Sequence, residues 1–213
     1  MIIAVEGIDG AGKQTLVESL IRHFDRENDI VTTVAFPRYT AAPYGTAIGE
    51  ALKAETSVLR SSIEAMSVMY AVDRWHWWNT LDEVYTVCLA DRWCASNAAY
   101  GSARMRLDDN DPTEFIDWVD DFEFGTLELP KPDLTLLLAT GEQVAASARQ
   151  SRAPEDAYEA TAGLQDHALD TYLRLADRSW GGRWLILDPM TGDGERRTAD
   201  DLASEVSHAI KQT

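Results

Sequence analysis

Cysteine is scarce in this chain, with only Cys88 and Cys94 among 213 residues. Two thiols are too few for a structural zinc site, and Cys88 lies in a buried-strand pattern, where a small core residue is typical. Cys94 has no histidine near it in the sequence, which argues against a catalytic thiol. We therefore expect neither a zinc centre nor thiol chemistry.

Long apolar runs and positive charge are also lacking. No run approaches the ~20 apolar residues of a membrane span, and the chain starts on a strand-like segment rather than a secretory signal. Lys and Arg number 19 against 36 Asp and Glu, a net charge of -17. This charge would repel a phosphate backbone, so we expect no nucleic-acid partner and no membrane, and a cytoplasmic protein. Either a need for high solubility or adaptation to a salt-rich cell interior would explain the negative net charge.

What the chain does contain is a glycine-rich loop, residues 7–13, between an apolar β-type run and a helical pattern. Its glycines let the backbone curl so that several N–H groups point at one spot, and the helix N-terminus adds more donors. Lys13 is placed to reach the outer phosphates. The sequence therefore predicts a phosphate site at Gly7, Ile8, Asp9, Gly10, Ala11, Gly12, Lys13, Gln14 and Thr15.

The loop lacks one expected feature, a Ser or Thr directly after Lys13. Gln14 stands there and Thr15 follows. The hydroxyl that usually holds Mg²⁺ is thus missing or displaced, and Asp9 and Glu159 are carboxylates that could replace it. A turn that only joins a strand to a helix is the alternative interpretation.

Apolar strand-like runs recur along the chain with helical patterns between them, at 2–6, 30–36, 85–90, 134–139 and 184–187. Continuous apolar strands that alternate with helices are typical of a parallel sheet covered on both faces. Ligands of such sheets bind at the carboxyl ends of the strands. We expect one α/β domain over 1–213, with a five-stranded sheet and a short lid at about 148–158.

Charged and aromatic residues follow two of these runs. Asp91 and Arg92 close the third, where a carboxylate can hold Mg²⁺ and an arginine can grip a phosphate with two hydrogen bonds. A surface ion pair is the alternative. Residues 36–39, Phe-Pro-Arg-Tyr, follow the second run. There an aromatic ring can stack on a base and a tyrosine can reach a phosphate, or the segment is a packed proline turn.

A long helical pattern at about 57–84 places Tyr70 and Arg74 four residues apart on one face. That face could present a ring and a guanidinium to one ligand, or the arginine could be a surface residue. The adjacent segment 75–78, Trp-His-Trp-Trp, cannot all pack against one core, and we interpret part of it as a subunit interface. His76 has no triad-like context and is interpreted as structural.

Two further segments carry candidate residues. Ser96 and Asn97 begin a predicted helix, where either could cap it or Asn97 could pair with a base edge, and Tyr100 faces the same way. Arg149 and Arg152 flank a polar segment that we interpret as the lid. Lid arginines can close over a phosphoryl group and stabilise its charge, although an ordinary charged loop would look similar.

Together these segments resemble the thymidylate kinase family, in the bacterial branch of the P-loop nucleoside monophosphate kinases. The likeness runs through nearly the whole chain, in segments 6–13, 36–39, 73–74, 91–93, 95–100, 129–134 and 158–159. It implies the P-loop kinase fold, transfer of the γ-phosphoryl group of ATP to dTMP for dTTP synthesis, Mg²⁺ and a homodimer. The lid, with only Arg149 and Arg152, is poor in arginine for this family.

The resemblance also implies site residues. For dTMP these are Asp9, Phe36, Tyr39, Tyr70, Arg74, Arg92, Ser96, Asn97, Tyr100 and Tyr158. The catalytic residues would be Asp9, Lys13, Arg92, Arg149 and Arg152. The metal would be held by Asp9, Asp91 and Glu159.

By the same analogy, Phe36 would stack on thymine and Arg74 would bond a carbonyl of the base. Asn97 would read the base edge, Tyr100 would disfavour a ribose, and Tyr39 would help Arg92 to hold the acceptor phosphate.

Three other functions fit parts of the pattern. A different nucleoside or nucleotide kinase would differ in the residues that face the base. A nucleotide-driven switch would hydrolyse ATP without an acceptor. A weakened paralogue would bind nucleotides and transfer the phosphoryl group slowly.

Overall fold

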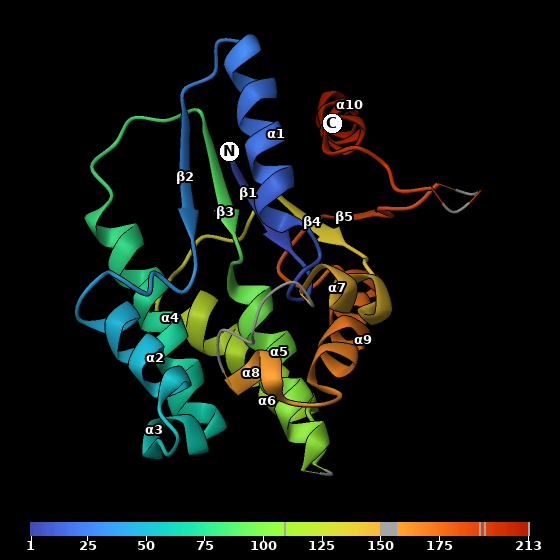
Figure 1. Ribbon diagram of the computed structural model, residues 1–213. Coiled ribbons are helices and arrows are strands. Elements are labelled where there is room, and N and C mark those ends of the chain that lie inside the picture. The colour runs from blue at the N-terminus through green and yellow to red at the C-terminus, as the bar shows by residue number, and fades with distance from the viewer. Residues whose placement is uncertain (109, 150–156, 192, 194, 213) are drawn as a thin grey trace.

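The computed structural model describes residues 1–108, 110–149, 157–191, 193 and 195–212. Its centre is a five-stranded sheet in the order β2-β3-β1-β4-β5, in which every pair is parallel (Figure 1). The strands are Ile2–Glu6 (β1), Val31–Ala35 (β2), Val87–Asp91 (β3), Leu134–Leu138 (β4) and Trp184–Leu187 (β5). All five predicted strands are confirmed, and their ends differ from the predicted ones by no more than two residues at either end.

Helices fill the chain between the strands. They are α1 (Lys13–Arg26), α2 (Tyr44–Lys53), α3 (Val58–Ser61), α4 (Ile63–Thr80), α5 (Cys94–Leu107), α6 (Thr113–Asp120), the π-helical η1 (Asp121–Thr126), α7 (Glu142–Arg149), α8 (Ala157–Ala160), α9 (Leu164–Asp177) and α10 (Ala199–Lys211). Among the described residues, no helix has both the length and the apolar composition needed to cross a bilayer.

The central strands are buried along their whole length. Every residue of β1 and β4 is buried, as expected for parallel strands that are covered on both faces. Helix α1 lies over β1, β2 and β3 and packs against α10, while α5 packs against α9, α4 and α6. The carboxyl ends of β2 and β3 point toward α2, α4 and α5, so the rim predicted to carry the site is enclosed by helices (Figure 1).

The single helix predicted at about 57–84 is wrong. Two helices, α3 and α4, occupy this stretch, and the chain is extended between them at Ser62. The Ser62 hydroxyl accepts a hydrogen bond from the N–H of Ala65 at 3.0 Å, and so caps α4. A serine side chain competes with the backbone for such bonds, which favours a new N-terminus over continuation of the helix. Helix α4 then ends at Thr80, before the predicted limit.

Two of the four residues in the 75–78 segment lie in an aromatic cluster within the chain. The ring centroids of Trp77 and Trp78 each lie 6.4 Å from that of Trp93, and the centroid of Trp77 lies 5.8 Å from that of Phe36. Trp93 is only 1% exposed. Trp75 remains 38% exposed. Trp77 and Trp78 therefore pack within the chain rather than form an exposed patch, which leaves Trp75 for the predicted interface.

Two glycines of α2 hold the segment after β2 close to that helix. A Cβ on Gly45 would lie 1.9 Å from the carbonyl oxygen of Arg38, and a Cβ on Gly49 would lie 3.3 Å from the ring of Tyr39. The atoms that a Cβ on Gly45 would meet belong to the backbone of Arg38, so rotating a side chain cannot relieve the clash. It follows that Gly45 fixes the position of the 36–39 segment.

We predict that Gly45→Ala lowers the free energy of unfolding by about 1–3 kcal/mol, because the added methyl group must push the backbone of Arg38 away. Gly141→Ala is the matched control, since a Cβ there meets no atom within 4 Å. Urea denaturation of both variants measures the difference. Equal stability of the two would contradict the close packing of α2 on residue 38.

Candidate active site

The predicted phosphate loop lies between β1 and α1. Gly7, Gly10 and Gly12 have φ angles of 145°, 82° and 99°, values that side-chain-bearing residues rarely adopt. Gly12 is the residue that precedes the first turn of α1, and its carbonyl accepts a hydrogen bond from Leu16 at 3.1 Å. The loop therefore curls into the helix N-terminus, the geometry that concentrates backbone N–H donors for a phosphate.

Lys13 is held inside this loop. Its Nζ donates to the carbonyl oxygen of Ile8 at 3.0 Å, and the side chain is buried. Burial and the nearby Arg92 together lower the pKa of Lys13 to about 8. Gln14 and Thr15, in contrast, are both exposed in the first turn of α1.

An ion pair joins the loop to the end of β3. Arg92 Nη2 bonds Asp9 Oδ1, so this pair links the segments that follow two adjacent strands. Arg92 has a φ of 71°, in the left-handed region that is costly for a side-chain-bearing residue, and its N–H donates to Val5. This conformation places the arginine over Asp9, and its guanidinium carbon lies 4.8 Å from the ring centre of Tyr100.

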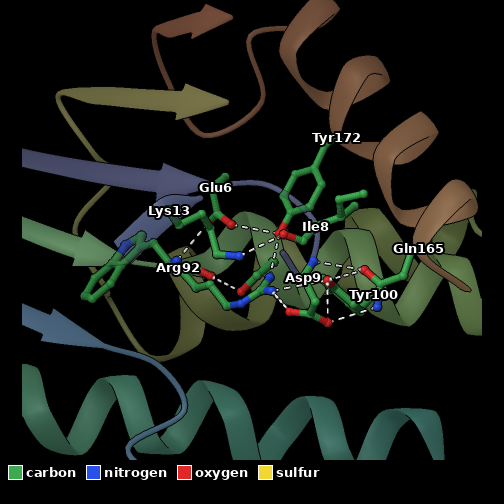
Figure 2. A network of polar contacts seen from close by, with 10 residues as sticks. Glu6, Ile8, Asp9, Lys13, Arg92, Tyr100, Gln165 and Tyr172 are labelled. Carbon is green, nitrogen blue, oxygen red and sulfur yellow. Dashed lines mark hydrogen bonds and ion pairs between the residues drawn. The ribbon is translucent and has the colours of Figure 1, made fainter. Parts of the chain in front are cut away.

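Asp9 is held by three further contacts. Gln165 of α9 donates to Asp9 Oδ2 at 2.9 Å and accepts from the N–H of Asp9 at 3.1 Å. The Tyr100 hydroxyl lies 3.2 Å from the same Oδ2. Burial alone would raise the pKa of Asp9, but Arg92 and Lys13 outweigh it and lower that pKa to about 2. Figure 2 shows the side chains of Arg92, Tyr100 and Gln165 converging on Asp9.

Glu6, the last residue of β1, extends the network inward. It is fully buried, and its carboxylate accepts from the N–H of Trp93 at 2.7 Å and from the hydroxyl of Tyr172 at 2.8 Å. Tyr172 in turn lies 3.3 Å from Arg92 Nη1 (Figure 2). Burial raises the pKa of Glu6 to about 7, against the lowering influence of Arg92.

Beside this network lies a pocket that encloses about 480 Å³ of space, open solvent at its mouth included. The ten acceptor residues that the family resemblance implied all line it, and Pro37 and Leu52 complete the lining. They come from the ends of β1, β2 and β3 and from α2, α4, α5 and α8. Those at the strand ends follow from the rule that ligands of parallel sheets bind at the carboxyl ends of the strands. The rings of Tyr100 and Tyr158 are stacked in this wall, with an interplanar angle of 9°.

At one end of the pocket Arg74 is already paired. Its Nε donates to Glu123 Oε2 at 2.8 Å, and its Nη2 donates to Glu123 Oε1. Arg74 is therefore a buried, paired residue rather than a surface arginine, and two of its five N–H donors are used within the protein. Arg38, in the motif after β2, is likewise engaged, since it donates to Asp73 at 3.0 and 2.8 Å and so anchors that segment to α4.

The lid predictions lie mostly outside what the structure describes. Arg152 lies outside the described residues. Arg149 ends α7 and Glu159 lies in α8, but their side chains are not described. Tyr158, at the other limit of the predicted lid, lines the pocket.

The three predicted metal ligands differ in availability. Asp91 Oδ1 is buried and has no hydrogen-bond partner in the described part of the chain, whereas both oxygens of Asp9 accept bonds from protein groups. Over the same residues, no three His, Cys, Asp or Glu side chains gather as a ready-made metal site. A Mg²⁺ site built from one carboxylate, water and substrate phosphates fits this donor set better than an all-protein cage.

Several site residues were missed by the sequence analysis: Glu6, Pro37, Leu52, Glu123, Gln165 and Tyr172. Glu6 carried a signal, because it is the one acidic residue in an apolar run. Gln165, Tyr172 and Glu123 lie in helical segments without a motif. Arg196 was also missed, and its Nη2 lies 3.3 Å from where a Cβ on Gly12 would be.

Cys88 lies in the core, as its buried-strand pattern predicted. Cys88 and Cys94 are both buried and free. Burial, together with Glu123, raises the pKa of Cys94 well above its usual value, so the reactive thiolate is disfavoured.

Comparisons with known proteins agree with one another. A family model described as thymidylate kinase matches residues 5–189. The thymidylate kinase of Mycobacterium tuberculosis is 41% identical over 196 residues, covering 88% of this chain and 91% of that protein. That of Cupriavidus necator is 30% identical, covering 98% and 96%. A solved structure of thymidylate kinase from Candida albicans superimposes with a TM-score of 0.74 at 20% identity, covering 99% of this chain and 91% of that one, a likeness of fold.

The pKa of Glu6 gives a pH prediction. The usual pKa of a glutamate is 4.5, and the pKa of Glu6 in the folded chain is about 7. Between these two pH values the folded chain keeps a proton on Glu6 that the unfolded chain has released. The contribution of Glu6 to stability therefore falls as pH rises through this window, by a total on the order of 3 kcal/mol. Other carboxylates, Asp9 among them, act in the opposite direction, so the effect must be isolated with a variant.

Glu6→Gln removes this titration and keeps a side chain of the same shape. We expect the change in unfolding free energy between pH 5.5 and pH 8 to differ between the variant and the parent, with the parent losing more stability toward pH 8. Urea denaturation at both pH values measures it. An identical pH dependence in the two proteins would mean that Glu6 is charged throughout.

Proposed function

This chain belongs to the thymidylate kinase family, and it is an ATP-dependent nucleoside monophosphate kinase that phosphorylates dTMP to dTDP. We propose that dTMP binds in the pocket beside Asp9 and that ATP binds at the loop 7–15. One observation carries this assignment. The ten residues suggested for the acceptor line a single pocket, which shares Asp9 with the phosphate loop. A donor and an acceptor placed on the two sides of Asp9 would meet there.

We propose that the phosphate of dTMP lies at the Arg92 end of the pocket. Arg92 and Tyr39 both line it, and a guanidinium can bind a phosphate with two hydrogen bonds. The base then lies toward Arg74 and Asn97, with Phe36 and Tyr70 as the aromatic surfaces nearby. Tyr100, held beside Asp9, would lie next to the sugar and crowd a 2′-hydroxyl.

The reaction requires positioning and charge neutralisation more than covalent chemistry. Lys13 would bind the transferred phosphoryl group, and the bound phosphate would raise its pKa again, because an anion favours the ammonium form. Arg92, Arg149 and Arg152 would stabilise the charge as it develops. Asp91, whose Oδ1 has no hydrogen-bond partner among the described residues, would hold Mg²⁺ together with water and substrate phosphates, with Asp9 and Glu159 as further candidate ligands. The ion would neutralise phosphate oxygens when bound.

We further propose a homodimer that acts in the cytoplasm, where its ATP is available. The support for a dimer is exposed apolar surface on α3 and α4, since Val58 is 91% and Trp75 38% exposed.

The experiment is ADP formation from Mg-ATP with dTMP, dUMP, dCMP, dGMP, UMP and thymidine as separate acceptors. We expect fast turnover with dTMP, slower turnover with dUMP and near none with the others, because the pocket presents a fixed hydrogen-bonding edge. ADP formation that needs no acceptor would indicate a switch ATPase. Binding of both nucleotides without ADP formation would indicate a weakened paralogue.

Two variants control this assay. Lys13→Ala should abolish ADP formation and leave dTMP binding nearly unchanged, because Lys13 faces the donor loop. Lys53→Ala, at an exposed position of α2, should behave like the parent. Activity retained in Lys13→Ala would trace the ADP to a contaminant or place the donor elsewhere.

A further inference from the structure

Glu123 is a buried carboxylate that neither the phosphate loop nor the acceptor phosphate uses. It is 0% exposed and lies in the π-helical segment η1. π-Helical turns are rare and frequently occur at functional sites. The position of Glu123 is fixed by its own backbone, since its carbonyl accepts a hydrogen bond from the N–H of Leu129 at 2.9 Å.

The two oxygens of Glu123 accept three hydrogen bonds from pocket residues. Arg74 gives two of these, one to each oxygen, and Asn97 Nδ2 gives the third to Oε1 at 2.7 Å. An ionised carboxylate only accepts hydrogen bonds. Glu123 therefore joins a residue of α4 to a residue of α5 and dictates which atoms of each face it.

This contact fixes the orientation of the Asn97 amide. Nδ2 also donates to the carbonyl oxygen of Ser67 at 3.0 Å, so both of its hydrogens point at groups that can only accept. A flipped amide would turn its oxygen toward the same acceptors, which is unfavourable. Asn97 Oδ1 is thus the atom left to accept a hydrogen bond in the pocket that Asn97 lines.

Arg74 supplies a hydrogen-bond donor beside this acceptor, because a guanidinium has N–H groups and no acceptor. The pocket thereby places a donor next to an acceptor. A 4-oxopyrimidine such as thymine presents the matching pair, a carbonyl at position 4 and an N–H at position 3. A 4-aminopyrimidine such as cytosine presents an amino donor at position 4 and a ring-nitrogen acceptor at position 3. In the same pose, the donor would face Arg74 and the acceptor would face Asn97 Oδ1, so neither hydrogen bond would form.

We propose that Glu123 is a positioning residue that makes the pocket select 4-oxopyrimidine over 4-aminopyrimidine nucleotides, by fixing the polarity of Arg74 and Asn97. This inference rests on the proposed function, since it takes the base to lie between these two residues.

The test compares dTMP with 5-methyl-dCMP, which differ only in this edge of the base, in the parent and in Glu123→Gln. A glutamine offers one oxygen and an NH₂ group where the carboxylate offers two oxygens, so Arg74 or Asn97 loses a partner. We expect the ratio of kcat/KM for dTMP to that for 5-methyl-dCMP to fall about ten- to a hundredfold. Most of the change should be in KM for dTMP, because Glu123 acts on base binding.

A ratio taken on one preparation does not depend on how much of it is folded. Glu128→Gln, at an exposed position five residues along the chain, is the matched control and should keep the parent ratio. Glu123→Asp keeps the charge and both oxygens on a shorter side chain, so it should lower the ratio less than Glu123→Gln does.

An unchanged ratio in Glu123→Gln, an equal loss with both nucleotides, or a larger effect of Glu123→Asp would overturn the proposal. A parent enzyme without dTMP turnover would instead refute the proposed function.

Discussion

The ion pair between Asp9 and Arg92 is the constraint on which the rest of the site depends. It exists because β1 and β3 are neighbours in the sheet, so the residues that follow them meet at one rim. Withdrawing two charges from water is costly unless further hydrogen bonds compensate them. Here Gln165, Tyr100 and Tyr172 provide those bonds, which also ties α5 and α9 to the phosphate loop.

This arrangement explains how a strongly acidic chain can hold two phosphorylated substrates. Its net charge is -17, yet Lys13, Arg74 and Arg92 all lie at the loop or the pocket. Lys13 and Arg74 are buried, and the Arg92 side chain is 13% exposed. In such surroundings a cation acts on a nearby phosphate with less screening by water than at the surface. The carboxylates Asp9 and Glu123 hold the arginines in place, so the positive charge is oriented before the substrates bind.

Much of the fold and pocket could be predicted because the signals were local. Apolar runs predicted the five strands and the glycines predicted the loop. The rule that ligands bind at the carboxyl ends of parallel strands brought the Phe36 segment and Arg92 together, whereas Tyr158 came from the family resemblance. The rest depends on tertiary contacts. Gln165 and Glu123 stand in helical segments with no motif. Only the packing of α9 on α5 and the ion pair of Glu123 with Arg74 of α4 make them part of the site. The break at Ser62 was missed because the helical spacing continues across it.

A crystal structure of the chain with dTMP bound tests the central claim most directly. The account predicts the phosphate of dTMP against Arg92, with Asp9 between it and the loop, and the base edge at Arg74 and the Oδ1 atom of Asn97. A nucleotide bound elsewhere, or in this pocket with its base at Arg92 and its phosphate at Arg74, would contradict it.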